Sequence, residues 1–155
     1  MTGTADPAGT GPRPYGDPEF HLALPEHWET VEPPGPPVAL IAVEPGDGET
    51  FRANVVVTAE DITDAGQWQQ AVGRALADHL QEYLLVDEQP AGDGVRRLFH
   101  HILPEAGAVT AEQWSWTAGH RGFTVTASAA TFDYDAKADL FAAVADGFRL
   151  QGAAT

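Results

Sequence analysis

The segment Val38–Val43 constrains the fold of this chain more than any other stretch. Its six residues, V-A-L-I-A-V, are all apolar. Neighbouring side chains of a β-strand point to opposite faces of the sheet, so a strand without a polar face has to be covered on both sides. Turn-forming residues follow at Pro45–Gly48, and a returning strand is expected at Phe51–Thr58. The sequence therefore predicts a hairpin in a sheet that carries other elements on both faces.

A long helix is predicted between Asp64 and Leu84. Apolar residues recur there at every fourth position from Trp68 onwards, while the opposite side is polar. Asp64 is followed three residues later by Gln67, which is the pattern of a helix-capping box. This stretch is therefore expected to form an amphipathic helix that lies on the sheet.

A second, shorter helix is predicted at Tyr134–Asp146. Asp133 is placed to cap its first turn. Gly147 follows its last residue, and a glycine at this position can adopt the left-handed conformation that commonly ends a helix.

The remaining apolar segments are bounded by glycine and proline turns, as strands are. With the hairpin, the predicted strands are Phe20–Leu24, Val38–Val43, Phe51–Thr58, Leu84–Gln89, Val95–Leu103, Val109–Ala118 and Gly122–Thr131. Short turns between consecutive strands favour an antiparallel arrangement. The order β-β-β-α-β-β-β-β-α predicts an α+β fold: an antiparallel β-sheet of about seven strands flanked by helices on both faces, an α/β/α sandwich.

A chain of 155 residues fits a single domain, which is expected to span residues 19–151. Residues 1–18 are rich in glycine and proline and hold few apolar side chains, so they are predicted to be a flexible leader. Residues 152–155 are predicted to be a frayed C-terminus. The leader shows neither the apolar run of an export signal nor a lipobox cysteine, and a cytoplasmic location is therefore expected.

The net charge of −15, from 23 acidic and 8 basic residues, narrows the range of partners. Nucleic acids and anionic membranes both require a basic surface. The only adjacent basic residues are Arg96 and Arg97, which a strand would point to opposite faces. No stretch approaches the ~18 consecutive apolar residues of a membrane span. We therefore expect neither nucleic-acid binding nor membrane insertion.

No residue pattern in the sequence predicts a catalytic, cofactor or metal site. The two serines, Ser115 and Ser128, lie in predicted strands and outside any G-x-S-x-G turn. His100 and His101 are neighbours in a strand, so one ion is not readily held by both. The segment Asp133–Asp135 lacks the glycine and the glutamate of a calcium loop, and the chain has no cysteine. We expect no enzyme activity, no cofactor and no metal.

Trp114 and Trp116 fall on one face of a predicted strand. Burial in the core is the ordinary role of such residues. The alternative is a partly open aromatic surface for a partner, which Trp28 could join, because tryptophan often anchors interfaces. The second helix is about 20 Å long and the sheet about 30 Å wide, so this helix cannot cover a whole face. The predicted partner-binding residues are therefore Trp114, Trp116 and Trp28.

Four segments carry a family resemblance: the strand that ends in proline and tryptophan at Phe20–Trp28, the strand Phe51–Val57, the tryptophan-bearing hairpin Glu112–Ala129, and the closing segment Leu140–Phe148. In these segments the chain resembles the Mog1/PsbP-like superfamily, and within it the LpqN-like and DcrB-like small actinobacterial proteins. The resemblance spans about Phe20 to Leu150. It implies an α/β/α sandwich and a non-enzymatic binder, such as the DcrB-like chaperones of secreted effectors, but it supplies no binding residues.

The leading hypothesis is a non-enzymatic protein-binding module, a cytoplasmic chaperone or adaptor whose partner is another protein. One alternative is a small-molecule or lipid-binding module with a pocket between sheet and helix. A second alternative is an enzyme whose site is assembled from scattered His, Asp and Glu residues. The sequence predicts neither the identity of the partner nor the oligomeric state.

Overall fold

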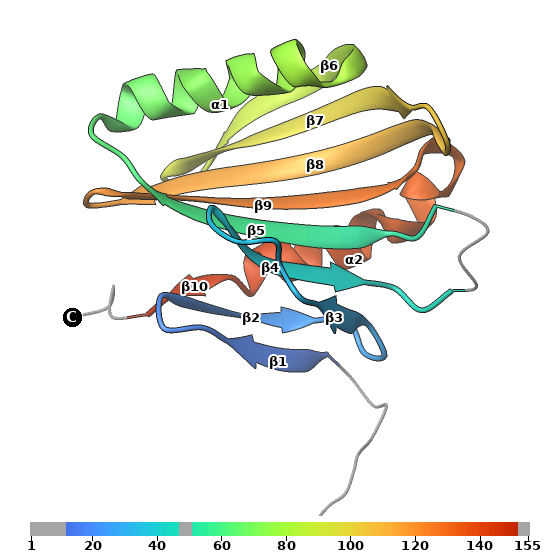
Figure 1. Ribbon diagram of the computed structural model, residues 1–155, viewed down its shortest axis with the longest axis horizontal. Coiled ribbons are helices and arrows are strands. Elements are labelled where there is room, and N and C mark those ends of the chain that lie inside the picture. The colour runs from blue at the N-terminus through green and yellow to red at the C-terminus, as the bar shows by residue number, and fades with distance from the viewer. Residues whose placement is uncertain (1–11, 47–50, 152–155) are drawn as a thin grey trace, which may run out of the picture.

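Two antiparallel sheets and two helices build the fold (Figure 1). The computed structural model describes residues 12–46 and 51–151. The large sheet has seven strands in the order β3-β4-β5-β9-β8-β7-β6, and the small sheet has the order β1-β2-β10. The elements are β1 (Arg13–Gly16), β2 (Phe20–Leu24), β3 (Glu29–Val31), β4 (Val38–Val43), β5 (Asn54–Asp61), α1 (Ala65–His79), β6 (Gln81–Ala91), β7 (Gly94–Leu103), β8 (Gly107–Ala118), β9 (Arg121–Ala130), the 3-10 turn η1 (Thr131–Asp133), α2 (Tyr134–Asp146) and β10 (Arg149–Leu150).

The two helices lie on opposite faces of the large sheet. Ser115 of β8 forms hydrogen bonds with α1. Its neighbour Trp114 belongs to the same buried cluster as Phe141 of α2. Because neighbours in a strand point to opposite faces, α1 and α2 must cover different sides. The predicted α+β fold class, with about seven strands and helices on both faces, is confirmed.

The main hydrophobic core lies between the large sheet, α2 and the small sheet. Phe20 of β2, Leu40 of β4 and Phe141 of α2 are fully or almost fully buried there. The small sheet closes the core on the side that α2 leaves open, and the last strand, β10, pairs with β2. The chain therefore needs its N-terminal and C-terminal segments together to complete one core.

The N-terminal prediction was wrong in two respects. The strand Phe20–Leu24 was expected in the large sheet but lies in the small one, and the seventh strand of the large sheet is the short β3. Within the predicted leader 1–18, residues Arg13–Gly16 form β1, which pairs with β2, and Tyr15 packs against the core. Residues 1–11 and 152–155 lie outside the described part of the chain.

The first helix is shorter than predicted. Asp64 caps it as expected, since its Oδ1 accepts a hydrogen bond of 2.8 Å from the Gln67 N–H. However, α1 ends at His79 and β6 begins at Gln81, with Glu82 at a φ of +56° near the start of the strand. Leu84, which continued the helical spacing, is therefore a strand residue. No residue of α1 is fully buried.

The second helix has the predicted bounds but not the predicted capping interactions. The turn η1 leads directly into α2, and the Asp133 side chain makes no capping hydrogen bond. Gly147 has a φ of −89°, so it is right-handed rather than left-handed. Neither helix in the described part of the chain combines the length and the hydrophobicity that a bilayer crossing requires.

The apolar strand β4 is covered on only one face. Leu40 and Ala42 point into the core and are buried, whereas Ala39, Ile41 and Val43 are half-buried. Figure 1 shows the reason: α1 lies over the β6 end of the large sheet, away from β4. The expectation of full cover on both faces was wrong for this strand, because a single helix spans only part of a seven-stranded face.

Candidate binding surfaces

The three tryptophans predicted to bind a partner lie in or against the core. Trp114 and Trp28 are only 7% and 6% exposed. Trp116 is half-buried and stacks on Phe148, with ring centroids 5.0 Å apart. All three pack on the α2 side of the large sheet. In this conformation they serve packing, and their use by a partner stays a prediction.

As expected, α2 leaves part of this face of the large sheet uncovered. The uncovered part lies over β6 and β7. Leu84 of β6 pairs with His100 of β7, which pairs with Thr110 of β8. Paired residues of antiparallel strands share a face, so these three side chains line up on the α2 side. Thr110 in turn donates a hydrogen bond of 2.9 Å to Thr131, next to Phe132. This line crosses the large sheet beside α2.

Large apolar side chains are exposed along and around this line. Leu84 is 60% exposed and Phe132 is 86% exposed. Leu98 and Ile102 of β7 lie on the same face and are half-buried. Leu85 and Val86 follow Leu84 in β6 and are 41% and 49% exposed. We call Leu84, Leu85 and Val86 the β6 apolar surface.

Strand β6 is also an edge of the large sheet. It pairs with β7 on one side only, and no backbone hydrogen bond from elsewhere in residues 12–46 and 51–151 reaches its other side. Register shifts near Leu84 and Asp87 leave Val86 without an opposite residue in β7. Natural edge strands are usually short or charged because an open apolar edge pairs with other chains. Strand β6 has eleven residues and also carries charges and a proline, but three consecutive apolar residues are exposed at its centre.

Ion pairs fix the strands that carry this surface. Arg96 Nε donates a hydrogen bond of 2.7 Å to Glu112, and its Nη1 lies 3.5 Å from Asp87. Glu112 is 4% exposed and lies beside Tyr134, where burial and the carboxylate raise the pKa of the tyrosine. Arg96 thus joins β6, β7 and β8 on the α2 side. Sequence analysis placed Arg96 on a strand but gave no sign of these partners.

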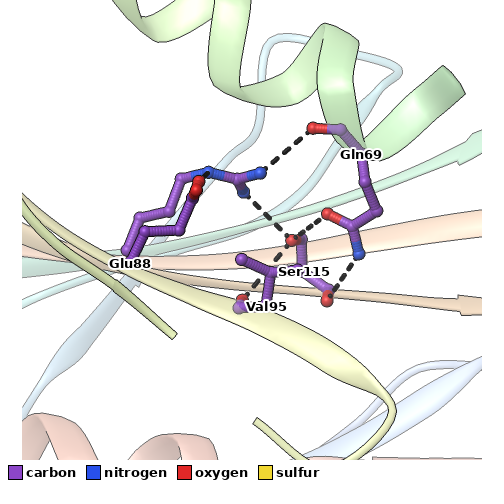
Figure 2. A network of polar contacts seen from close by, with 5 residues as sticks. Gln69, Glu88, Val95 and Ser115 are labelled. Atoms are coloured by element: carbon purple, nitrogen blue, oxygen red, sulfur yellow. Dashed lines mark hydrogen bonds and ion pairs between the residues drawn. The ribbon is translucent and has the colours of Figure 1, made fainter. Parts of the chain in front are cut away.

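Arg97 forms a separate network on the α1 side, as its position next to Arg96 required (Figure 2). The guanidinium is 4% exposed and donates to Glu88 at 2.8 Å. It also donates to the Gln69 carbonyl of α1 at 3.0 Å and to Ser115 at 3.3 Å. Ser115 Oγ donates to the Gln69 side chain at 2.6 Å. These bonds hold the first half of α1 on the large sheet.

Ser115, His100 and His101 are strand residues. Ser115 is completely buried by its network, so its hydroxyl is out of reach of a substrate. His100 Nδ1 lies 2.7 Å from the Thr110 hydroxyl, while His101 faces the other side of the sheet and is 8% exposed. Burial lowers the pKa of His101. Among the described residues, no three His, Asp or Glu side chains lie close enough to share a metal ion.

Comparison with known proteins gives a relation at the level of the fold. No protein-family model and no curated protein matches the sequence. The structure resembles cyanobacterial PsbP (CyanoP) from Synechocystis sp. PCC 6803, with a TM-score of 0.63 and 16% identity over 96% of this chain and 98% of that one. It resembles LpqN, described as involved in cell envelope biogenesis of Mycobacterium tuberculosis, with a TM-score of 0.63 and 15% identity over 88% of both chains.

A third solved structure is a Pseudomonas aeruginosa protein of unknown function, with a TM-score of 0.56 and 14% identity over 84% of this chain and 91% of that one. At these identities the likeness concerns architecture and transfers no site residue. The chain therefore has the PsbP-like fold shared by CyanoP and LpqN, as the sequence resemblance implied.

Proposed function

We propose that this protein is a non-enzymatic binding module that takes up an extended segment of another protein at the edge strand β6. The observation that carries the proposal is the β6 apolar surface, where Leu84, Leu85 and Val86 are each at least 41% exposed on an edge strand whose outer side is unpaired. Exposed apolar residues that gather on one surface are typical of protein interaction sites. A chaperone or adaptor role follows naturally from such a site.

A strand added beside β6 would contact side chains on both faces of the large sheet. A segment that pairs with an edge strand gains backbone hydrogen bonds, and its alternate side chains contact the two faces of the sheet. Leu84 pairs with His100 and Leu85 with Phe99, so the two leucines point to opposite faces. A partner strand beside them would contact Leu84 on one face and Leu85 on the other.

Charge favours a basic segment as the partner. The protein carries −15 net charges, and Glu82 and Glu88 flank the three apolar residues of β6. Glu88 keeps 48% of its side chain exposed although it binds Arg97. A segment that alternates apolar residues with lysine or arginine would therefore match both the hydrophobicity and the charge of this edge.

A second copy of the same chain fits the edge less well. Antiparallel self-pairing about Leu85 would place Glu82 of one copy opposite Glu88 of the other. Like charges directly opposite each other in a sheet are destabilising, and the net charge of both copies adds repulsion. We therefore propose a different protein as the partner.

Selection from a library of displayed twelve-residue peptides tests the proposal. The recovered peptides should alternate apolar and basic residues, and peptide binding should protect the β6 amides from hydrogen exchange. Lysine at an exposed edge position blocks pairing of this kind, so Leu84→Lys and Val86→Lys should each weaken binding about tenfold or more. Val31→Lys, on β3 at the other edge of the large sheet, is the matched control, since Val31 is 45% exposed, and it should bind as the wild type does.

The variants also separate the proposal from its rivals. Peptides whose apolar residues recur every three or four positions, and which protect α1, would point to helix docking elsewhere and contradict strand addition. Formation of a dimer that Leu84→Lys abolishes would make the second copy the occupant. If a folded Trp114→Ala variant loses peptide binding and the Leu84→Lys variant retains it, the binding site lies at the tryptophans instead.

A further inference from the structure

A groove lies on the other face of the large sheet, between α1 and strands β5 and β8, with a volume of about 390 Å³. One wall is formed by Val72 and Leu76 of α1 and by Leu80, which directly follows the helix; all three are half-buried. Glu60 and Gln113 also line it. A volume in this range suits a small organic molecule. The groove is separate from the β6 apolar surface.

The floor of this groove holds a polar atom without a partner. Gln113 is 6% exposed, and its Nε2 donates a hydrogen bond of 3.2 Å to Thr126. Its Oε1 is buried and has no hydrogen-bond partner in the described part of the chain. A buried acceptor without a donor is costly, and such groups are rare in folded proteins. An N–H donor from a bound molecule would remove this cost.

The wall beside Gln113 supplies a negative charge and an aromatic ring. Trp68 Nε1 donates a hydrogen bond of 2.9 Å to Glu60 Oε2, which holds the indole against the carboxylate. The ring rests on Gly122, where an added Cβ would come within 2.6 Å of Trp68 Cε2. Glycine therefore lets the indole lie directly on the large sheet. A carboxylate and an indole beside each other favour a cation, through charge and through the ring face.

The described lining of the groove has no side chain with a permanent positive charge for an anion. No Lys or Arg is among the described residues that line it. His79 is present, and its Nδ1 lies 2.9 Å from the Ala75 carbonyl, so this nitrogen carries the proton and donates it within α1. The groups left for a ligand are acceptors: the Gln113 oxygen and the Glu60 carboxylate.

We propose that this groove binds a small primary amine carried on an apolar chain. Its ammonium group would donate hydrogen bonds to Gln113 Oε1 and Glu60, and its apolar chain would lie along Val72, Leu76 and Leu80. The acidity of the whole protein would raise the local concentration of such a cation. The site is independent of partner binding at β6.

Titration with n-octylammonium tests the proposal, with octan-1-ol and octanoate as neutral and anionic counterparts of similar length. Calorimetry gives the affinity, and the indole N–H signals in NMR report the place, because the chain has only four tryptophans. We expect octylammonium to bind, to shift the Trp68 signal and to leave those of Trp28 and Trp114 in place. Octan-1-ol and octanoate should bind at least tenfold more weakly.

Two variants that preserve size identify the acceptors. Glu60→Gln and Gln113→Met should each lower the affinity for octylammonium about tenfold, because the first removes the negative charge beside the ammonium and the second removes an acceptor for it. Glu32→Gln, which removes one exposed carboxylate elsewhere, should leave the affinity unchanged. If Gln113→Met does not fold, Glu60→Gln still decides the question alone.

Several results would overturn the proposal: no binding of octylammonium, equal binding of octanoate, or an affinity that Glu60→Gln and Gln113→Met leave within twofold. A loss with Glu32→Gln as large as that with Glu60→Gln would show only general attraction to an acidic protein. Nα-acetyl-lysine amide keeps a free side-chain ammonium; if it binds as tightly as octylammonium, the small-molecule assignment is overturned and a lysine side chain becomes the source of the amine.

Discussion

Trp116 and Phe148 stack almost face to face, with planes 8° apart and centroids separated by 5.0 Å. Trp116 belongs to β8, whereas Phe148 lies between α2 and β10, where it also stacks on Phe20 of the small sheet. The pair therefore joins the large sheet to the small one. Phe148 is 7% exposed, so its ring is the central member of the connection.

Loss of the Phe148 ring should be costly. We expect Phe148→Ala to lower the free energy of unfolding by about 3–5 kcal/mol, measured by urea denaturation, because a buried ring leaves a cavity. Trp116→Ala should cost less because Trp116 is only half-buried, and a double-mutant cycle should give a coupling of about 0.5–1.5 kcal/mol. Phe132→Ala removes a ring that is 86% exposed and should change stability by less than about 0.5 kcal/mol.

Two N-terminal truncations should differ in their effect on stability, because only the longer one removes β1. Removal of residues 1–11 should leave the thermal midpoint nearly unchanged, since these residues are mostly glycine, proline and small polar residues. Removal of residues 1–18 should cost about 1.5 kcal/mol or more, because it deletes β1, the packing of Tyr15 on Phe20 and the hydrogen bond from Arg13 to the Trp28 carbonyl. Equal midpoints for both truncations would contradict the role of β1.

The ion pair of Arg97 and Glu88 should respond unequally to removal of its two members. Glu88→Gln leaves a guanidinium that is 4% exposed with neutral partners only, and we expect a loss of about 1–3 kcal/mol. Asp61→Asn breaks a pair whose carboxylate is 92% exposed and should cost less than about 0.5 kcal/mol. Hydrogen exchange should also show faster opening of α1 in Glu88→Gln, because Arg97 binds the Gln69 carbonyl. Equal costs for the two variants would show that Arg97 is well solvated.

His101 should make stability depend on pH. Burial lowers its pKa below the ordinary 6.5, and its Nδ1 has no partner in the described part of the chain. Below pH 6.5 the unfolded chain therefore binds more protons at this residue than the folded one, so stability is lost as the pH falls from 6.5 toward the lowered value. His101→Leu should remove this part of the loss in unfolding experiments at pH 5 to 8, whereas His120→Gln, at an exposed turn, should retain it.

Local patterns in the sequence were sufficient to predict the fold class and most of the helices and strands. Alternation and turn residues identified β7, β8 and β9, and the apolar spacing identified α2 with its correct bounds. Asp64 could be recognised as a cap because it acts on Gln67, only three residues away. Such interactions are local, so the sequence around them contains the information.

The helix boundary at Leu84 shows where this reasoning fails. A spacing of four residues fits a longer helix, yet Leu84 pairs with His100 in a sheet, and a long-range pairing overrides a weak local preference. The three apolar residues of β6 could be seen in the sequence, but their exposure could not. Exposure depends on which strand ends up at the edge of the large sheet, and that is set by pairing between distant segments.

The sequence by itself determined an acidic α+β fold whose apolar residues are numerous enough for a core. Only the tertiary structure decided that Trp114 and Trp28 are buried, that Arg97 is enclosed by residues 18 and 28 positions away, and that Gln113 is left with a buried acceptor. Hydrophobicity and helical or strand period are properties of neighbouring residues. Burial, edge position and hydrogen-bond partners arise from contacts between residues far apart in the chain, and the candidate sites depend on these.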